Sequence, residues 1–177
     1  MGRPVTRRWW RRNALALTAV AVLAPVTGLM IIGNEWWGTY QAAPVFPTTV
    51  APGDEISYAG ATWGPATIHV RPDDPDSDLP DGTTVYVVEV PLDPDSGPVR
   101  CSPPTLRELE GDQRQWDDAV SFVDWDYERP TLCDSEAVGP FTIAVPFLVP
   151  DDAVGPFGVD FLLTDELPGF LRLVVSP

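Results

Sequence analysis

The longest hydrophobic segment lies near the N-terminus. Ala14 to Gly33 is a run of twenty residues without a charge. As a helix rising roughly 1.5 Å per residue, it would span about 30 Å, which is the thickness of the bilayer core. Together with its flanking residues, this run predicts a transmembrane helix over residues 13–37.

A proline-rich segment follows. Residues 38–52 include QAAPVFPTTVAP, whose three prolines disfavour a helix and favour an extended polyproline conformation. We expect a semi-rigid stalk that holds the rest of the chain away from the membrane.

Residues 53–177 carry the pattern of an all-β domain. Residues 83–92 have apolar side chains on both faces, which predicts a central strand buried on both sides. Residues 105–116 predict a hairpin with its turn at Glu110-Gly111-Asp112. The further segments rich in β-branched and aromatic residues, separated by turn residues, are 61–70, 141–149, 156–164 and 170–175. About seven strands of this kind predict a two-sheet sandwich.

One segment of this domain has a helical period instead. Trp116, Ala119, Val120 and Val123 are spaced at i, i+3, i+4 and i+7. The two aspartates after Trp116 would lie in the first turn, where the helix dipole favours negative charge. We therefore expect a short helix or helical turn here.

Residues at the two ends of the apolar run indicate how it crosses the membrane. Arginines are concentrated before it and no acidic residue precedes Glu35, so the positive-inside rule predicts that residues 1–12 form a cytoplasmic tail. Tryptophan pairs lie at both ends, about 39 Å apart along a helix, and are expected in the two headgroup layers. The predicted membrane-interface residues are Arg7, Arg8, Trp9, Trp10, Arg11, Arg12, Trp36 and Trp37.

A cleaved signal peptide is the alternative to this anchor, because it has the same basic start and apolar middle. Its apolar middle is normally only about 7 to 15 residues long. Cleavage after Ala43 would also place Gln41 three residues before the cut, where a small residue is preferred. The uncleaved anchor is favoured, and cleavage stays open.

The charge of the chain changes sign after the apolar run. Residues 34–177 contain six arginines and 26 acidic residues, a net charge near −20. Nucleic-acid binding is therefore not expected, because phosphate contacts need clustered Lys and Arg. A solvated, self-repelling surface explains the acidity without a specific ligand.

The chain has two cysteines, Cys101 and Cys133, both in the part expected outside the membrane, where disulfides persist. We predict that they are joined. Closing a loop of this length stabilises a fold by roughly 3 to 4 kcal/mol in the chain-entropy model. Zinc is not expected, because two cysteines and the distant His69 fall short of four ligands.

Four segments resemble a known family when taken in order. They are GDEISYAGATWGPATIHV, VYVVEVPLD, TLRELEGDQRQW and PFLVPDDAVGPFGVDFLL, and they resemble the telokin-like extracellular domains of Gram-positive bacteria. These domains are immunoglobulin-like β-sandwiches on lipoproteins and membrane-anchored proteins, related to the mycobacterial immunoprotective extracellular protein.

The resemblance covers about residues 53–175 and includes the Phe-x-Val-Pro sequence at Phe147 to Pro150. It implies an immunoglobulin-like sandwich in an actinobacterial membrane-anchored protein, and it supplies no catalytic residues. The chain departs from the family because it lacks a lipid-accepting cysteine at the helix end and has a long insertion between Cys101 and Cys133.

Catalytic motifs are not evident in the sequence. His69 is the only histidine, so a nucleophile–histidine arrangement would have to use it, and there is no GxSxG sequence. We expect His69 to be an ordinary strand residue and the protein not to be an enzyme. A hydrolase of the cell envelope is the alternative.

An acidic stretch is the one candidate for a metal. Five aspartates lie between Asp73 and Asp81, and calcium takes oxygen ligands at such spacings. The glycine and glutamate of an EF-hand loop are misplaced, however. A solvated turn is favoured, a weak calcium site stays open, and no cofactor is predicted.

Aromatic residues between the two cysteines are the candidate for partner binding. They lie among acidic residues and are Trp116, Phe122, Trp125 and Tyr127. Aromatic anchors in a loop are typical of binding hot spots and equally of a small core beneath a loop. We expect a non-catalytic interaction module that binds another envelope protein with a basic patch, and a structural spacer is a further alternative.

Overall fold

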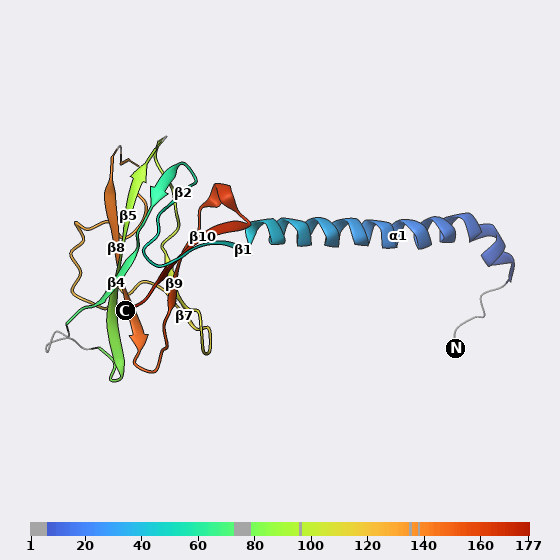
Figure 1. Ribbon diagram of the computed structural model, residues 1–177. Helices are drawn as coiled ribbons and strands as arrows, with labels where there is room; N and C mark the ends of the chain where they lie inside the picture. The colour runs from blue at the N-terminus through green and yellow to red at the C-terminus, as the bar shows by residue number, and fades with distance from the viewer. Residues whose placement is uncertain (1–6, 73–78, 96, 135, 138) are drawn as a thin grey trace. The chain divides into compact units, whose positions relative to one another are not determined.

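The computed structural model describes residues 7–72, 79–95, 97–134, 136–137 and 139–177. The chain divides into two compact units, Met1–Ala43 and Pro44–Pro177. Figure 1 shows one long helix in the first unit and two β-sheets in the second.

The helix α1 (Arg7–Ala42) is 36 residues long. Its part from Trp9 to Ala42 is long and apolar enough to cross a membrane. The predicted helix is thus confirmed, and it extends beyond residues 13–37 at both ends. Aromatic rings meet near both ends of it, Trp9 with Trp10 at 5.6 Å and Trp37 with Tyr40 at 6.2 Å between ring centroids.

The first sheet contains five strands in the order β1 (Phe46–Val50), β10 (Gly169–Val175), β9 (Phe157–Phe161), β6 (Thr105–Glu108) and β7 (Gln115–Trp116). All neighbours are antiparallel except β1 and β10, which are parallel. The β6–β7 pair confirms the predicted hairpin. A short 3₁₀ helix, η1 (Thr164–Glu166), lies between β9 and β10.

The second sheet is built around β5 (Thr83–Pro94). β8 (Phe141–Pro150) pairs with one side of β5 through ten residue pairs. β3 (Ala61–Trp63) and β4 (Thr67–Val70) pair in succession with the other side, and β2 (Ile56–Tyr58) adds to β3. The prediction of a central strand at residues 83–92 is therefore confirmed.

The predicted strand at 61–70 is interrupted by a bulge. Trp63 pairs with Leu92 and Thr67 with Glu89, so three residues of this edge face only two of β5. At the bulge Gly64 has φ +92°, and a Cβ atom there would lie 2.9 Å from the carbonyl oxygen of Asp54. Only glycine fits this backbone without strain.

The two sheets enclose one hydrophobic core. Trp63 is fully buried in it, with its ring 5.0 Å from that of Phe161 and its indole N–H donating to the carbonyl oxygen of Tyr58 at 2.9 Å. Other members come from both sheets and include Val88, Val90, Ile143, Phe147, Leu171 and Leu173. This arrangement confirms an all-β domain of two packed sheets.

The predicted stalk is wrong for Phe46–Val50, which form β1 in parallel register with β10. The N–H groups of Val45 and Phe46 both donate to the carbonyl oxygen of Pro168, at 2.8 and 3.1 Å. β1 is an edge strand, and an edge strand tolerates Pro47 because a missing N–H on its open side breaks no ladder hydrogen bond. The β domain therefore starts before residue 53, and its described residues form ten strands rather than about seven.

The predicted helix around Trp116 to Val123 is also wrong. Trp116 ends strand β7, and the chain then forms turns, of which one is closed by the N–H of Phe122 donating to the Ala119 carbonyl at 2.9 Å. Val120 and Val123 do face the same way, toward the second sheet. The apolar spacing thus identified the buried side chains, while hydrogen bonds to β8 hold the backbone in a non-helical path.

Candidate functional site

The structure confirms the disulfide between Cys101 and Cys133. Within the segment that it closes, residues 117–130 form what we call the covering loop. The Ala119 N–H donates to the carbonyl oxygen of Pro146, and the Ala144 N–H donates to that of Pro130, both at 2.8 Å. The covering loop therefore occupies the edge of β8, which would otherwise present unpaired backbone groups.

Trp125 anchors the covering loop to the outer face of the second sheet. Its side chain is 6% exposed and packs with Val87 of β5 and Ala144 of β8, with Val120 and Val123 beside them. The Arg129 guanidinium lies 5.2 Å from the centre of the Trp125 ring. Trp125 is therefore part of a small core beneath a loop and is not an exposed binding residue.

Phe122 and Tyr127 lie on the opposite side of the loop, where they are 69% and 78% exposed. Side-chain hydrogen bonds fix the turns that carry them. Asp118 Oδ1 accepts from the Val120 N–H at 3.3 Å, and Asp126 Oδ1 accepts from the Glu128 N–H at 3.0 Å. The two exposed aromatic rings are thus held by an ordered backbone.

Trp116, the fourth aromatic candidate, is partly buried and packs against the main core. Its ring lies 6.1 Å from that of Phe157, edge to face, and the Arg114 guanidinium lies 5.7 Å from its centre. The structure thus does not place the four candidate residues on one surface. It buries Trp125, partly buries Trp116 and leaves Phe122 and Tyr127 exposed.

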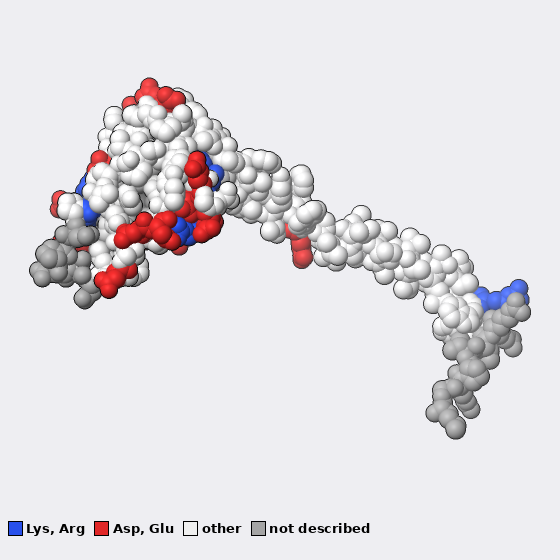
Figure 2. All heavy atoms as spheres, turned by 60° about the horizontal axis from the view of Figure 1, so that its bottom comes forward, with Lys and Arg blue, Asp and Glu red and all other residues white. Residues whose placement is uncertain are grey.

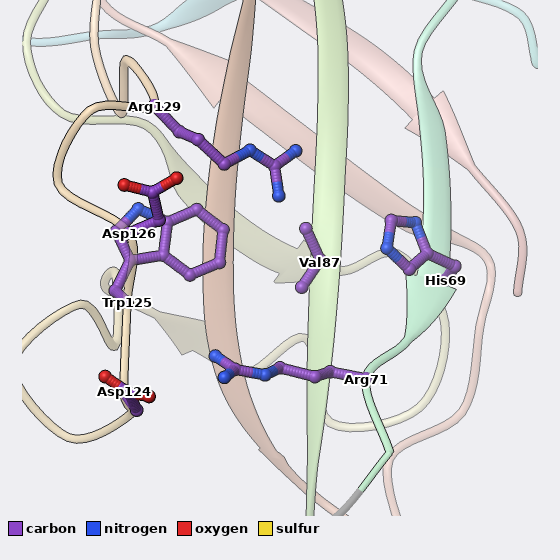
Figure 3. A pocket seen from close by; sticks show the side chains of 7 residues that line it. All are labelled: His69, Arg71, Val87, Asp124, Trp125, Asp126 and Arg129. Carbon is purple, nitrogen blue, oxygen red and sulfur yellow. The ribbon is translucent and has the colours of Figure 1, made fainter.

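A cleft of about 440 Å³ opens between the covering loop and β4. Val87 of β5 forms its floor, as Figure 3 shows. His69 of β4 and Arg71, which follows that strand, line one side. The loop lines the other side with Asp124, Trp125, Asp126 and Arg129. His69 is thus a strand residue, as expected, and its side chain is exposed. It also borders a cleft that is lined by four charged side chains.

Two buried carboxylates on the first sheet are paired with arginines. Asp160 of β9 accepts two hydrogen bonds from Arg172 of β10, both at 2.6 Å, and the Arg107 Nε lies 3.6 Å from it. The hydrogen bonds to Asp160 raise the pKa of Arg172. These groups form a charged ladder across β6, β9 and β10 on the face away from the core.

Glu108, at the end of β6, is the second buried carboxylate. Arg114 Nε donates to its Oε2 at 3.1 Å, and the Val154 N–H donates to its Oε1 at 2.8 Å. The hydrogen bonds from Arg114, followed by the one from Val154, lower the pKa of Glu108 to about 2. Arg114 also pairs with Asp152 at 2.9 Å, so these contacts tie the hairpin to the loop after β8.

The charged residues of the cleft and of the ladder were not predicted as sites. Arg71, Arg129 and Asp160 belong to no recognisable motif in the sequence. The alternation of Val159, Asp160 and Phe161 is the one available signal, because it would place Asp160 on the opposite face of the strand from its apolar neighbours. Their partners depend on strand register and on a loop more than thirty residues away, which the periodic pattern does not contain.

The predicted membrane-interface residues lie at the two ends of α1. Trp9, Trp10, Trp36 and Trp37 are exposed on the helix surface. Arg7, Arg8, Arg11 and Arg12 lie in its first turns. Figure 2 shows the middle of the helix without charged side chains, whereas the visible face of the β unit carries several acidic patches and few basic groups.

Metal ligands are not gathered in the part of the chain that the structure describes, where no three His, Cys, Asp or Glu side chains are placed to hold an ion. Residues 73–78 of the acidic stretch, for which a weak calcium site was left open, lie outside the described residues. No family model matches the chain, and no curated protein or solved structure matches it.

Proposed function

We propose that this chain is a membrane-anchored interaction module that acts outside the cytoplasm without catalysis. The observation that carries the proposal is the pair of exposed aromatic side chains, Phe122 and Tyr127, on a loop that a disulfide and a buried tryptophan hold in place. Exposed aromatic residues on an ordered backbone are the usual centre of a protein interface, because little conformational entropy is lost when they bind.

The location of the β unit is inferred from the helix and the disulfide. α1 has the length and composition of a membrane span, and its arginines favour a cytoplasmic N-terminus. A disulfide in the β unit agrees with an oxidising compartment on the other side of the membrane. We infer a single-pass protein with residues 44–177 outside.

Strand order supports an immunoglobulin-like fold for the β unit. β10, β9, β6 and β7 follow one another as strands G, F, C and C′ do in a variable-type domain, and β5 pairs with β8 as strand B pairs with E. The covering loop occupies the edge of β8, where strand D would lie. Together with the resemblance of its sequence segments, this order supports assigning the domain to the telokin-like type.

The charge of the loop suggests the chemistry of the partner. Exposed carboxylates lie close to Phe122 and Tyr127 in the sequence, namely those of Asp124, Asp126 and Glu128. A basic patch on another envelope protein would pair with these carboxylates, and its cations would also be attracted to the aromatic faces. Nucleic acid and anionic wall polymers would be repelled.

Photo-crosslinking in intact cells tests this proposal. A photoreactive phenylalanine analogue at position 127 should capture a protein with a basic surface. The captured protein, purified with the full chain in detergent, should bind more weakly as salt increases. The double variant Phe122→Ala, Tyr127→Ala should weaken this binding by about tenfold or more.

Val154→Ala is the matched control, because Val154 is a 55% exposed apolar residue outside the covering loop. It should leave binding unchanged. If the double variant binds the captured protein as the wild type does, the loop is not the contact surface. If position 127 captures nothing specific, the structural-spacer alternative is favoured, and turnover of an envelope substrate by the purified chain would favour the hydrolase.

A further inference from the structure

Arg71 is a cation without an ion-pair partner among the described residues of a strongly acidic part of the chain. Four of the six arginines beyond α1 form ion pairs, namely Arg107, Arg114, Arg129 and Arg172. Within the described residues, Arg71 forms no ion pair although its side chain is partly buried. A partly buried guanidinium loses hydration, and an anion would restore its hydrogen bonds.

The cleft brings further groups to the same place. In Figure 3 the Arg129 guanidinium lies above Val87, and that of Arg71 lies below it, on the side of Trp125 and Asp124. The His69 ring lines the side that faces Trp125. Arg129 is oriented by its ion pair with Glu89 and by the Trp125 ring. The space between them thus has donors at its ends and apolar surface at its floor and wall.

The surrounding carboxylates limit the charge that the cleft can accept. Asp124 and Asp126 lie on the side of the Trp125 ring away from His69 (Figure 3), and Glu89 already pairs with Arg129. A dianion such as phosphate would meet three negative charges nearby, whereas a monoanion meets half of that repulsion. The apolar floor and wall favour a ligand with a hydrophobic body.

We propose that this cleft binds an organic carboxylate attached to an apolar or aromatic group. The carboxylate accepts hydrogen bonds from Arg71, and the apolar group lies on Val87 against Trp125. A free carboxylic acid and the C-terminal carboxylate of a peptide share this chemistry. The site is separate from the exposed Phe122 and Tyr127, which do not line the cleft.

Calorimetric titration of the full chain in detergent micelles tests the proposal with N-acetylphenylalanine as the probe. We expect saturable binding, and binding of the neutral analogue N-acetylphenylalaninamide should be about tenfold weaker or more, because the charge-assisted hydrogen bonds are lost. The peptide acetyl-Ala-Ala-Phe distinguishes a peptide C-terminus from a free carboxylic acid. If it binds more tightly than N-acetylphenylalanine, the ligand is a peptide end, and if both bind equally, the ligand is a free acid.

Arg71→Gln and Arg100→Gln form a matched pair, because both remove one positive charge but Arg100 is exposed and lies outside the cleft. Arg71→Gln should weaken binding of the probe about tenfold, and Arg100→Gln should leave it unchanged. The proposal is overturned by the absence of saturable binding, by equal binding of acid and amide, by tighter binding of inorganic phosphate, or by equal effects of the two variants. None of these results bears on the crosslinking at position 127.

Discussion

At the scale of single residues, Glu108 illustrates how one buried carboxylate makes stability depend on pH. Its pKa is about 2 in the folded protein and about 4.5 as a free side chain. The ionised form therefore stabilises the fold at every pH above 4.5, and this contribution is lost as the pH falls toward 2. Glu108→Gln should lower the urea midpoint at neutral pH and should flatten its dependence on pH between 4.5 and 2.

Glu110→Gln is the control for this experiment, because Glu110 belongs to the same hairpin and is exposed. The urea midpoint of the Glu110→Gln variant should depend on pH as that of the wild type does. A Glu108→Gln profile that runs parallel to the wild-type profile through the acid range would contradict the role assigned to this carboxylate.

Burial of apolar residues was predicted from the sequence more reliably than the pairing of polar residues. Val120 and Val123 were expected on one side of their segment, and they are, although the segment is not helical. Glu108 was simply one residue of a predicted hairpin. Its burial depends on Val154, 46 residues further along the chain, and no local pattern encodes such a contact.

At the scale of elements, the disulfide and the covering loop form one unit that protects β8. Replacing Cys101 and Cys133 by serine should lower the free energy of unfolding by roughly 3 to 4 kcal/mol, because the unfolded chain gains conformational entropy. In the native state, the loss of protection from hydrogen exchange should be confined to the covering loop and its contacts with β8. The amides of Ala119 and Ala144, which bond between the loop and β8, should exchange hydrogen faster, whereas the ladder between β5 and β8 should keep its protection.

Hydrogen exchange measured by mass spectrometry, with peptides from β9 and β10 as the internal reference, checks this expectation. Equal loss of protection in the loop and in both sheets would show that the disulfide acts on the whole domain rather than on the loop. Retained protection of Ala119 and Ala144 would show that packing of Trp125 alone holds the loop.

Strands with a clear alternation were predicted well, and strands that break a local rule were not. β5, β8, β9 and β10 follow from their runs of β-branched and aromatic residues. β1 was missed because Pro47 argues against a strand, and only its place at a sheet edge makes proline acceptable. The split between β3 and β4 depends on the close approach of Gly64 to Asp54, a tertiary contact.

At the scale of the whole molecule, the proposed location of the protein depends on α1, which is long and apolar enough to span a membrane. α1 ends at Ala42, so the candidate cut after Ala43 would fall in the short segment between α1 and β1. The expectation of an uncleaved anchor therefore rests on Trp36 and Trp37, which only the uncleaved chain would place in the outer headgroup layer.

We predict that the protein purified from membranes retains its N-terminal segment, so that peptides containing Trp9 and Trp10 are recovered from it. A mature species that begins near Ala42 or Pro44 would show that the helix is a cleaved signal. Protease added outside spheroplasts should digest residues 44–177 and leave an N-terminal tag intact. Replacing Arg7, Arg8, Arg11 and Arg12 by glutamine should make the N-terminal tag more accessible to the protease, because these charges favour the cytoplasmic side. An unchanged digestion pattern would mean that other features set the orientation.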